Sequence, residues 1–158
     1  MDFYAYQRPL GKIEDVTELR DKFISVYDEK DKRDAVRFGL LYGRHLLDIT
    51  GIEPTAEIMN AFTAIQRWLN GKTNYHEARN ISFRSLYENA REEKDMVKQR
   101  FYRTMAQIAC IPHVKFHALW ASDFAVTLVN RMYPGDLDKV EKERRFQISL
   151  MESIKTDS

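Results

Sequence analysis

The sequence contains only one cysteine, Cys110, among its 158 residues. A single cysteine excludes an internal disulfide and a four-cysteine zinc site, and small secreted domains seldom lack such crosslinks. Residues 1–10 hold no basic stretch followed by an apolar run, and no later segment approaches the roughly 18 apolar residues that span a membrane. We therefore expect a cytoplasmic protein that is neither exported nor inserted into a membrane.

An excess of charge of one sign is also lacking. The 25 lysine and arginine residues face 24 aspartate and glutamate residues, which leaves a formal net charge of +1. Such a balanced chain has no overall field that would attract nucleic acid or an anionic membrane, so neither is expected as a partner. With 44% hydrophobic residues the chain can bury one core, and we expect a single domain over residues 1–158.

Glycine and proline are scarce, with six and four residues. The intervals between them suit helices and are too long for a meander of short strands. Apolar residues recur along these intervals at steps of three and four, which predicts amphipathic helices. The expected fold class is all-α, a bundle of about six to seven helices with room for solenoid-like pairing. The helical segments are expected at 13–27, 35–49, 54–69, 74–90, 97–109, 112–133 and 138–154. The segment 97–109 is either a separate helix or a kinked extension of the one before it, with a boundary near 91–96.

The segment 112–133 differs from the others because it is apolar on nearly every side. His117 and Asp123 are among its few polar residues. A helix that is hydrophobic all round is enclosed by its neighbours. We therefore expect this segment to be the central helix of the bundle.

Local signals predict where several helices begin and end. Gly51 suits the left-handed residue that ends a helix. Asn74 with Glu77, and Asp138 with Glu141, have the spacing of a reciprocal cap, in which each side chain binds the other residue's backbone N–H. We expect each pair to start a helix.

Both ends of the chain are expected to lie outside the helices. Residues 1–12 form an N-terminal arm that contains Phe3, Tyr4 and Tyr6. Aromatic side chains bury a large area, so the arm should pack on the protein's own core or exchange contacts in a homodimer. The polar tail 155–158 is expected to fray.

Two histidines four residues apart, His113 and His117, form the sharpest local pattern. On one helix this step places both imidazoles on the same face, where they could share a metal ion. A third ligand would have to come from elsewhere, such as His45, Asp48 or Asp123. We favour a structural role, with His113 near a helix N-terminus and His117 hydrogen-bonded beside the core, and a metal-binding bundle or metal-dependent enzyme is the alternative.

Asp123 interrupts the apolar central helix. A buried carboxylate without a partner is costly, so we expect a polar network in the core that pairs Asp123 with an arginine, a histidine or a hydroxyl. An ion pair that fixes how helices pack is a commoner use of such a group than catalysis. The candidate partners are Arg79, His117, Arg44 and Arg84.

No complete catalytic constellation accompanies these residues. Cys110 lies among apolar residues, where a thiol is inert. No serine has the G-x-S-x-G setting, and the sequence holds no glycine-rich loop that could cradle phosphate. The basic run 142–145 is diluted by glutamates and has the pattern of a solvated helix face. We therefore predict no catalytic residue and no cofactor.

Several landmarks follow one another along residues 33–151. They are the apolar segment 35–47, the helix end 67–72 (RWLNGK), the triplets 77–79 (EAR) and 90–92 (ARE), and the run 113–125 with its His-Val and His-Ala pairs. In this order they resemble a family of small all-helical bacterial proteins described as immunity proteins of toxin–immunity loci. The His-Val and His-Ala run is the most distinctive part of the resemblance.

The resemblance implies a non-enzymatic protein whose helical surface binds a partner protein, such as a cognate toxin, and neutralises it. Inhibition by binding needs a preformed surface with a few anchored side chains and complementary charge. The resemblance carries over no catalytic residue. The leading hypothesis is therefore an immunity-like, all-α protein-binding module.

Overall fold

The computed structural model describes residues 13–155, and the arm 1–12 and most of the tail, 156–158, lie outside this range. The described chain consists of helices and short connections, with no strand. The helices are α1 (Thr17–Asp28), α2 (Lys32–Thr50), α3 (Ala56–Leu69), α4 (His76–Ile81), the π-helix η2 (Ser82–Leu86), α5 (Tyr87–Glu92), α6 (Met96–Ala109), α7 (His117–Met132) and α8 (Leu137–Ser153). Because α4, η2 and α5 follow without a break, they form one rod, and the all-α prediction is confirmed.

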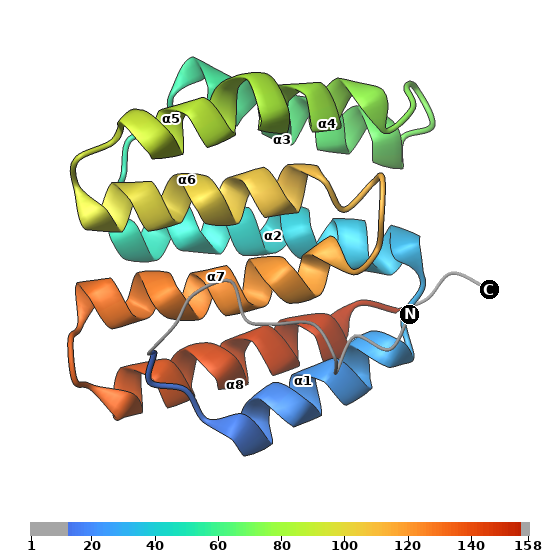
Figure 1. Cartoon of the computed structure of the whole chain (residues 1–158). Coiled ribbons are helices and arrows are strands. Elements are labelled where there is room, and N and C mark those ends of the chain that lie inside the picture. Colours follow the sequence, from blue (N-terminus) through green and yellow to red (C-terminus); the bar gives the residue numbers. More distant parts are fainter. Residues whose placement is uncertain (1–12, 156–158) are drawn as a thin grey trace.

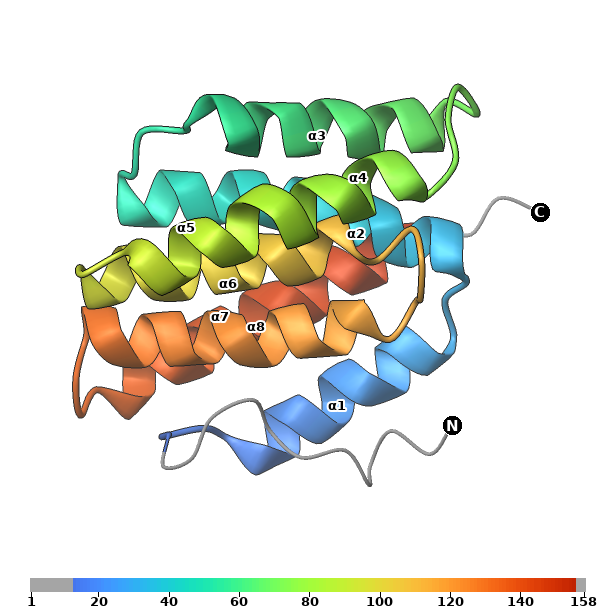
Figure 2. The same ribbon diagram turned by 45° about the horizontal axis from the view of Figure 1, so that its top comes forward.

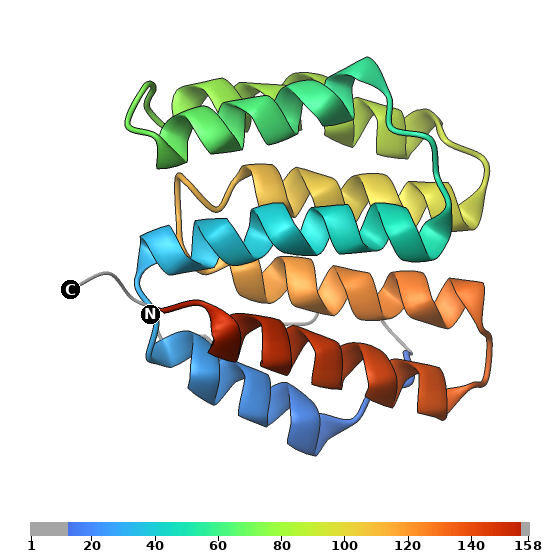
Figure 3. The same cartoon turned by 180° about the vertical axis from the view of Figure 1, so that it is seen from behind.

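The helices run side by side in stacked pairs (Figure 1). At one end of the stack, α3 lies beside the rod formed by α4, η2 and α5, and the next pair is α2 with α6, as the rear view in Figure 3 shows. α7 and α8 form a third pair, and α1 packs against α8 at the far end. Figure 2 shows α7 between α6 and α1. The last helix of the chain thus contacts the first.

The central helix is α7, as its apolar sequence predicts. Every residue from Ala118 to Val129 except Trp120 is buried. α7 packs against α6, α8 and α2. Small side chains such as Ala121 and Ala125 let these helices approach closely, which gives the core its dense packing. Within residues 13–155, no helix has both the length and the apolar character needed to cross a membrane.

Two helix ends follow local rules closely. Gly51 ends α2 with φ of 68°, the left-handed conformation that glycine adopts without a steric penalty. Asp31 starts the same helix by accepting from the backbone N–H of Asp34, whose side chain accepts in turn from the N–H of Asp31. This reciprocal cap satisfies two N–H groups that the first turn of a helix leaves without partners.

Both reciprocal caps predicted from sequence were wrong. Asn74 accepts from the N–H of His76 in a local turn, and Glu77 binds Arg67. The last helix is capped by Asp136, which accepts from the N–H of Lys139 at 3.3 Å.

The first helix also begins later than predicted, at Thr17 and not at Ile13. The carboxylate of Asp15 is held by Arg144 of α8 ahead of the first turn, so the chain enters this helix only after Asp15 is anchored.

Two glycines inside α2 allow unusually close helix contacts. A Cβ on Gly39 would lie 2.6 Å from Ile111 Cδ1, and one on Gly43 would lie 2.8 Å from Phe62 Cε1 and 3.2 Å from Met105 Sδ. Both distances to carbon are shorter than real Cβ contacts. One face of α2 is therefore pressed against α3 and α6, and a side chain of any size would separate them.

Gly43→Ala should destabilise the fold even though alanine favours a helix by about 1 kcal/mol. The added methyl group would overlap Phe62, and forced repacking costs about 1–3 kcal/mol. We expect the free energy of unfolding, measured by urea titration, to fall by about 1 kcal/mol. Thr63→Ala, at an exposed position of α3, is the control and should change it by about 0.5 kcal/mol or less. A Gly43→Ala protein as stable as the wild type would contradict the close contact.

Candidate functional site

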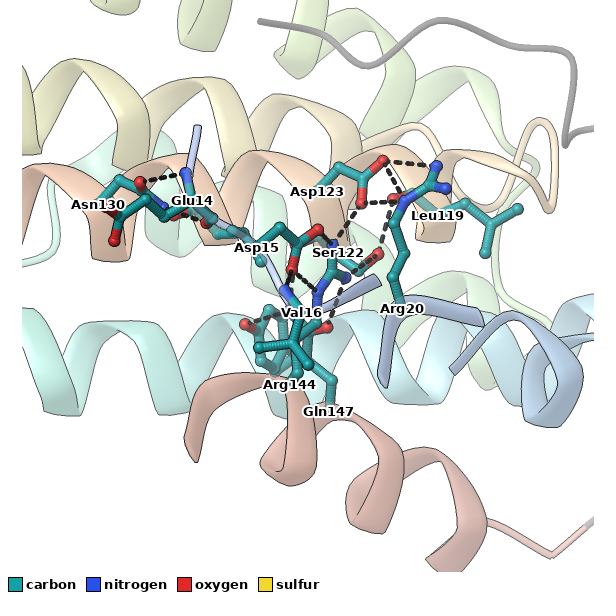
Figure 4. A network of polar contacts seen from close by, with 12 residues as sticks. Glu14, Asp15, Val16, Arg20, Leu119, Ser122, Asp123, Asn130, Arg144 and Gln147 are labelled. Atoms are coloured by element: carbon teal, nitrogen blue, oxygen red, sulfur yellow. Dashed lines mark hydrogen bonds and ion pairs between the residues drawn. The ribbon is translucent and has the colours of Figure 1, made fainter. Parts of the chain in front are cut away.

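A buried network of charged side chains joins the segment before α1 to α7 and α8 (Figure 4). Arg144 of α8 has 0% of its surface exposed. Its Nη2 donates to Asp15 Oδ2 and to Asp123 Oδ1, both at 2.7 Å, and its Nε donates to Asp15 Oδ1 at 2.9 Å. Arg20 of α1 also binds Asp123, through Nε to Oδ1 and Nη2 to Oδ2, both at 3.0 Å. These contacts fix α1 against α7 and α8.

The charges of these four side chains balance, because two carboxylates face two guanidinium groups. Burial alone would raise the pKa of Asp123, but Arg144 and Arg20 hold that pKa below its usual range. Burial also opposes the charge on Arg144, whereas its hydrogen bonds to Asp15 and the charge of Asp123 raise its pKa. Both groups are therefore charged at neutral pH. Removing either one would therefore leave the charges of the buried network unbalanced.

The network continues through neutral groups toward α2. Arg144 Nη1 donates to Gln147 Oε1 at 3.1 Å, and Gln147 Nε2 donates to Tyr42 Oη at 2.9 Å. The Tyr42 hydroxyl donates to Glu143 Oε2 at 2.5 Å, and His45 Nε2 lies 3.0 Å from that oxygen. Burial, followed by the Glu143 charge, raises the pKa of Tyr42 well above its ordinary value. The hydroxyl therefore remains a donor.

The His45 end of the network meets a small surface cavity. The cavity has a volume of about 130 Å³ and is lined by residues of α2, α7 and α8 and of the connection between the last two helices. Phe146 stacks on His45 with ring centroids 3.7 Å apart, and Tyr133 and Lys139 also line the cavity. Sites for small-molecule ligands usually have volumes of about 300 Å³ or more. This cavity suits one side chain of a partner better than a substrate.

The arginines that bind Asp123 differ from those that the sequence favoured. Asp123 faces α1 and α8, which supply Arg20 and Arg144, whereas Arg44 is exposed on α2. Arg79 lies on the rod beyond α6, where its guanidinium carbon is 5.3 Å from the ring centroid of Phe83. Arg84 is exposed on the same rod.

His117 belongs to a separate polar chain. Its Nδ1 lies 2.7 Å from Gln107 Oε1, and Gln107 Nε2 donates to the Tyr87 hydroxyl at 2.7 Å. Burial, with a smaller contribution from the charge of His113, lowers the pKa of His117 to about 4. The imidazole is therefore neutral at pH 7, and it serves as a link between α6 and α7.

The three histidine candidates do not converge. α7 begins at His117, so His113 lies in the preceding turn and the expected shared helix face was wrong. The turn that contains Pro112 delays the start of the helix. The His113 ring stacks on Tyr75 with centroids 4.4 Å apart, while His45 lies in the charged network. In the part of the chain that the structure describes, no three His, Cys, Asp or Glu side chains are grouped so as to hold a metal ion.

Cys110 is buried at the end of α6. Its thiol donates to Ser82 Oγ at 3.3 Å, and Ser82 donates in turn to the carbonyl of Ala106. Burial raises the pKa of the thiol, which disfavours the reactive thiolate. The contacts of Cys110 thus join η2 to α6.

Sequence reasoning missed Arg20, Arg144 and Gln147. The basic run 142–145 was interpreted as a solvated face, but Arg144 is buried within it. A signal was present, because Arg144 and Gln147 fall in register with the apolar residues Val140, Ile148 and Met151, at helical steps of three and four. Two polar residues in register with an apolar stripe indicate buried groups that need partners.

Comparison with known protein families adds to this geometry. Residues 25–154 match the Imm-5 like putative immunity protein family. The chain belongs to this family. The match includes all of α2 to α8 and so extends slightly beyond the landmarks at 33–151. No curated protein matches the chain significantly. No solved structure matches it significantly.

The family match divides the charged network of this Imm-5 like protein. Asp123 and Arg144 lie within residues 25–154, whereas Asp15 and Arg20 precede them. Asp15 and Arg20, which hold α1 against α7 and α8, thus come from the part of the chain that precedes the family match.

Acidification should destabilise the protein through His117. Its pKa is about 4 in the folded chain and near the ordinary 6.5 when unfolded, so the unfolded state binds a proton first. The stability present above pH 6.5 is therefore lost as the pH falls toward 4. We measure the free energy of unfolding by urea titration at pH 7 and at pH 4.5. Between these values, the free energy of unfolding of the wild type should fall by about 1 kcal/mol more than that of His117→Gln, allowing for solvent screening.

His76→Gln, which changes an exposed imidazole, is the control and should keep the pH dependence of the wild type. An identical pH dependence for the wild type and His117→Gln would show that the buried imidazole is not the group that titrates.

Proposed function

We propose that this chain is a non-enzymatic immunity protein that binds a partner protein, such as a cognate toxin, and neutralises it. The proposal rests on one observation, the family match over residues 25–154. That match spans nearly all of the described chain, so the function of an immunity protein is proposed for the domain as a whole and not for a fragment of it.

The geometry supports inhibition by binding. The charged network holds α1, α7 and α8 in one arrangement, and the glycines of α2 hold it tightly to α3 and α6. A surface built on such a frame loses little conformational entropy on binding, and preorganisation increases affinity.

The surface also presents large apolar side chains that could anchor a partner. Phe83 of η2 is 53% exposed, and Tyr133 and Leu137 are exposed near the turn between α7 and α8. Aromatic residues are enriched among the few side chains that carry most of the binding energy of an interface. We further propose that binding takes place in the cytoplasm, as the single buried cysteine suggests.

Co-expression with a candidate toxin domain, taken from a gene next to that of this chain, tests this proposal. We expect the chain to restore growth of cells that produce the toxin, and we expect the purified proteins to form a stable complex in calorimetry. An inactive toxin variant controls for growth effects unrelated to toxicity, and light scattering reports whether the chain binds as a monomer or as a homodimer.

Absence of both protection and complex formation would contradict the proposal. Protection without a complex would contradict its non-enzymatic part, because it would indicate that the chain modifies the toxin or its target.

A further inference from the structure

Three arginines gather where α6 packs against α7. Arg100 and Arg103 lie one turn apart on α6, and Arg131 lies near the end of α7. Burial lowers the pKa of the Arg100 guanidinium, and the charges of Arg103 and then Arg131 lower it further. Arg100 thus lies near enough to Arg103 and to Arg131 for each to repel it. No carboxylate within residues 13–155 forms an ion pair with any of them.

Arg100 is the most unusual member of this group. Only 7% of its surface is exposed, and its buried Nε and Nη1 atoms have no hydrogen-bond partner within the described residues. Arg144, the other buried arginine, binds two carboxylates and a glutamine. A buried guanidinium that lacks such partners is costly for the free protein. A negative charge bound close to Arg100 would offset part of that cost.

A groove opens beside one of these arginines, Arg103. It has a volume of about 480 Å³ and is lined by Phe83, Tyr87 and Arg91 of the rod, Arg103 of α6 and Phe124 of α7. The π-helix η2 contributes Phe83 to the wall of the groove. π-Helices are rare, and they occur frequently at functional sites.

The chemistry of the groove favours a carboxylate next to an apolar side chain. Guanidinium groups bind carboxylates through charge-assisted hydrogen bonds, and the aromatic rings offer an apolar surface beside them. A continuous polyanion such as a nucleic acid fits less well, because Glu88 pairs with Arg91 at the rim and Glu92 follows it. A segment of a protein can present one carboxylate without meeting this repulsion.

We propose that this groove, between α5, α6 and α7, binds an acidic segment of the partner protein. A carboxylate of that segment pairs with Arg103, which lines the groove, the charges of Arg100 and Arg131 add to the attraction, and an apolar side chain of the segment contacts Phe83. This inference rests on the proposed immunity function, since it names the surface through which the partner is bound.

The partner's affinity for charge-neutralised variants tests the proposal. The probe is the toxin domain used above, and its Kd is measured by calorimetry for the wild type, Arg103→Gln and Arg131→Gln. Arg145→Gln is the matched control, because it removes the same charge from an exposed pair on α8. We expect Kd to rise about tenfold or more for Arg103→Gln, to rise for Arg131→Gln, and to change by less than about twofold for Arg145→Gln.

Arg100→Met provides a readout that a structural role would not give. Since the substitution removes an unpaired buried charge, the Tm of the free protein should rise by about 2–4 °C, while the toxin binds about tenfold more weakly or worse. A lower Tm would show that Arg100 serves the fold, and it would overturn the proposal.

The remaining outcomes are distinct. If the toxin binds the wild type and all charge variants equally, the groove is not the binding surface, although the immunity function stands. If the toxin does not bind the wild type, the proposed function fails and the groove assignment fails with it. A fluorescent single-stranded oligonucleotide could also bind the chain more tightly than the toxin does, with its binding weakened by Arg103→Gln and Arg131→Gln. That result would assign the groove to nucleic acid and overturn the proposal.

Discussion

The arrangement of this bundle depends on the burial of one guanidinium group, that of Arg144. A charge that is fully withdrawn from water requires carboxylates in good geometry, and Asp15 and Asp123 provide them from segments far apart in the sequence. Arg20 then balances the second carboxylate. Because all four groups must meet, α1 is held against α7 and α8 by electrostatics as well as by apolar packing. The frame is rigid where the first and last helices of the chain meet.

The two buried arginines within residues 13–155 have opposite surroundings. Arg144 has every requirement for its charge met inside the fold, whereas Arg100 lies beside two further arginines and has donors without acceptors. Natural proteins tolerate such local costs at functional sites. The same frame that satisfies Arg144 therefore holds the unsatisfied cation of Arg100 one turn from Arg103, which lines the proposed binding groove.

Much of the fold could be predicted from the sequence, because the periodicity of apolar residues is local. It indicated an all-α bundle and the central helix α7, with its nearly continuous burial from Ala118 to Val129. The partners of Asp123 could not be predicted, because they depend on which faces of distant helices meet. The prediction that His113 shares a helix face with His117 was also wrong, because a turn delays the start of α7. Arg100 gave no local signal, because its lack of partners is a property of its surroundings in the fold.

The most direct test of the central role of Arg144 is a double-mutant cycle with Asp123→Ala and Arg144→Met, with stability measured by urea titration. Each single change should cost about 3–5 kcal/mol, because it leaves an unbalanced charge in the buried network. The double variant should cost less than the sum of the two by about 2 kcal/mol, since the two charges that then remain, those of Asp15 and Arg20, balance. Costs that add to within about 0.5 kcal/mol would contradict the account, because the guanidinium and the carboxylate would then contribute independently.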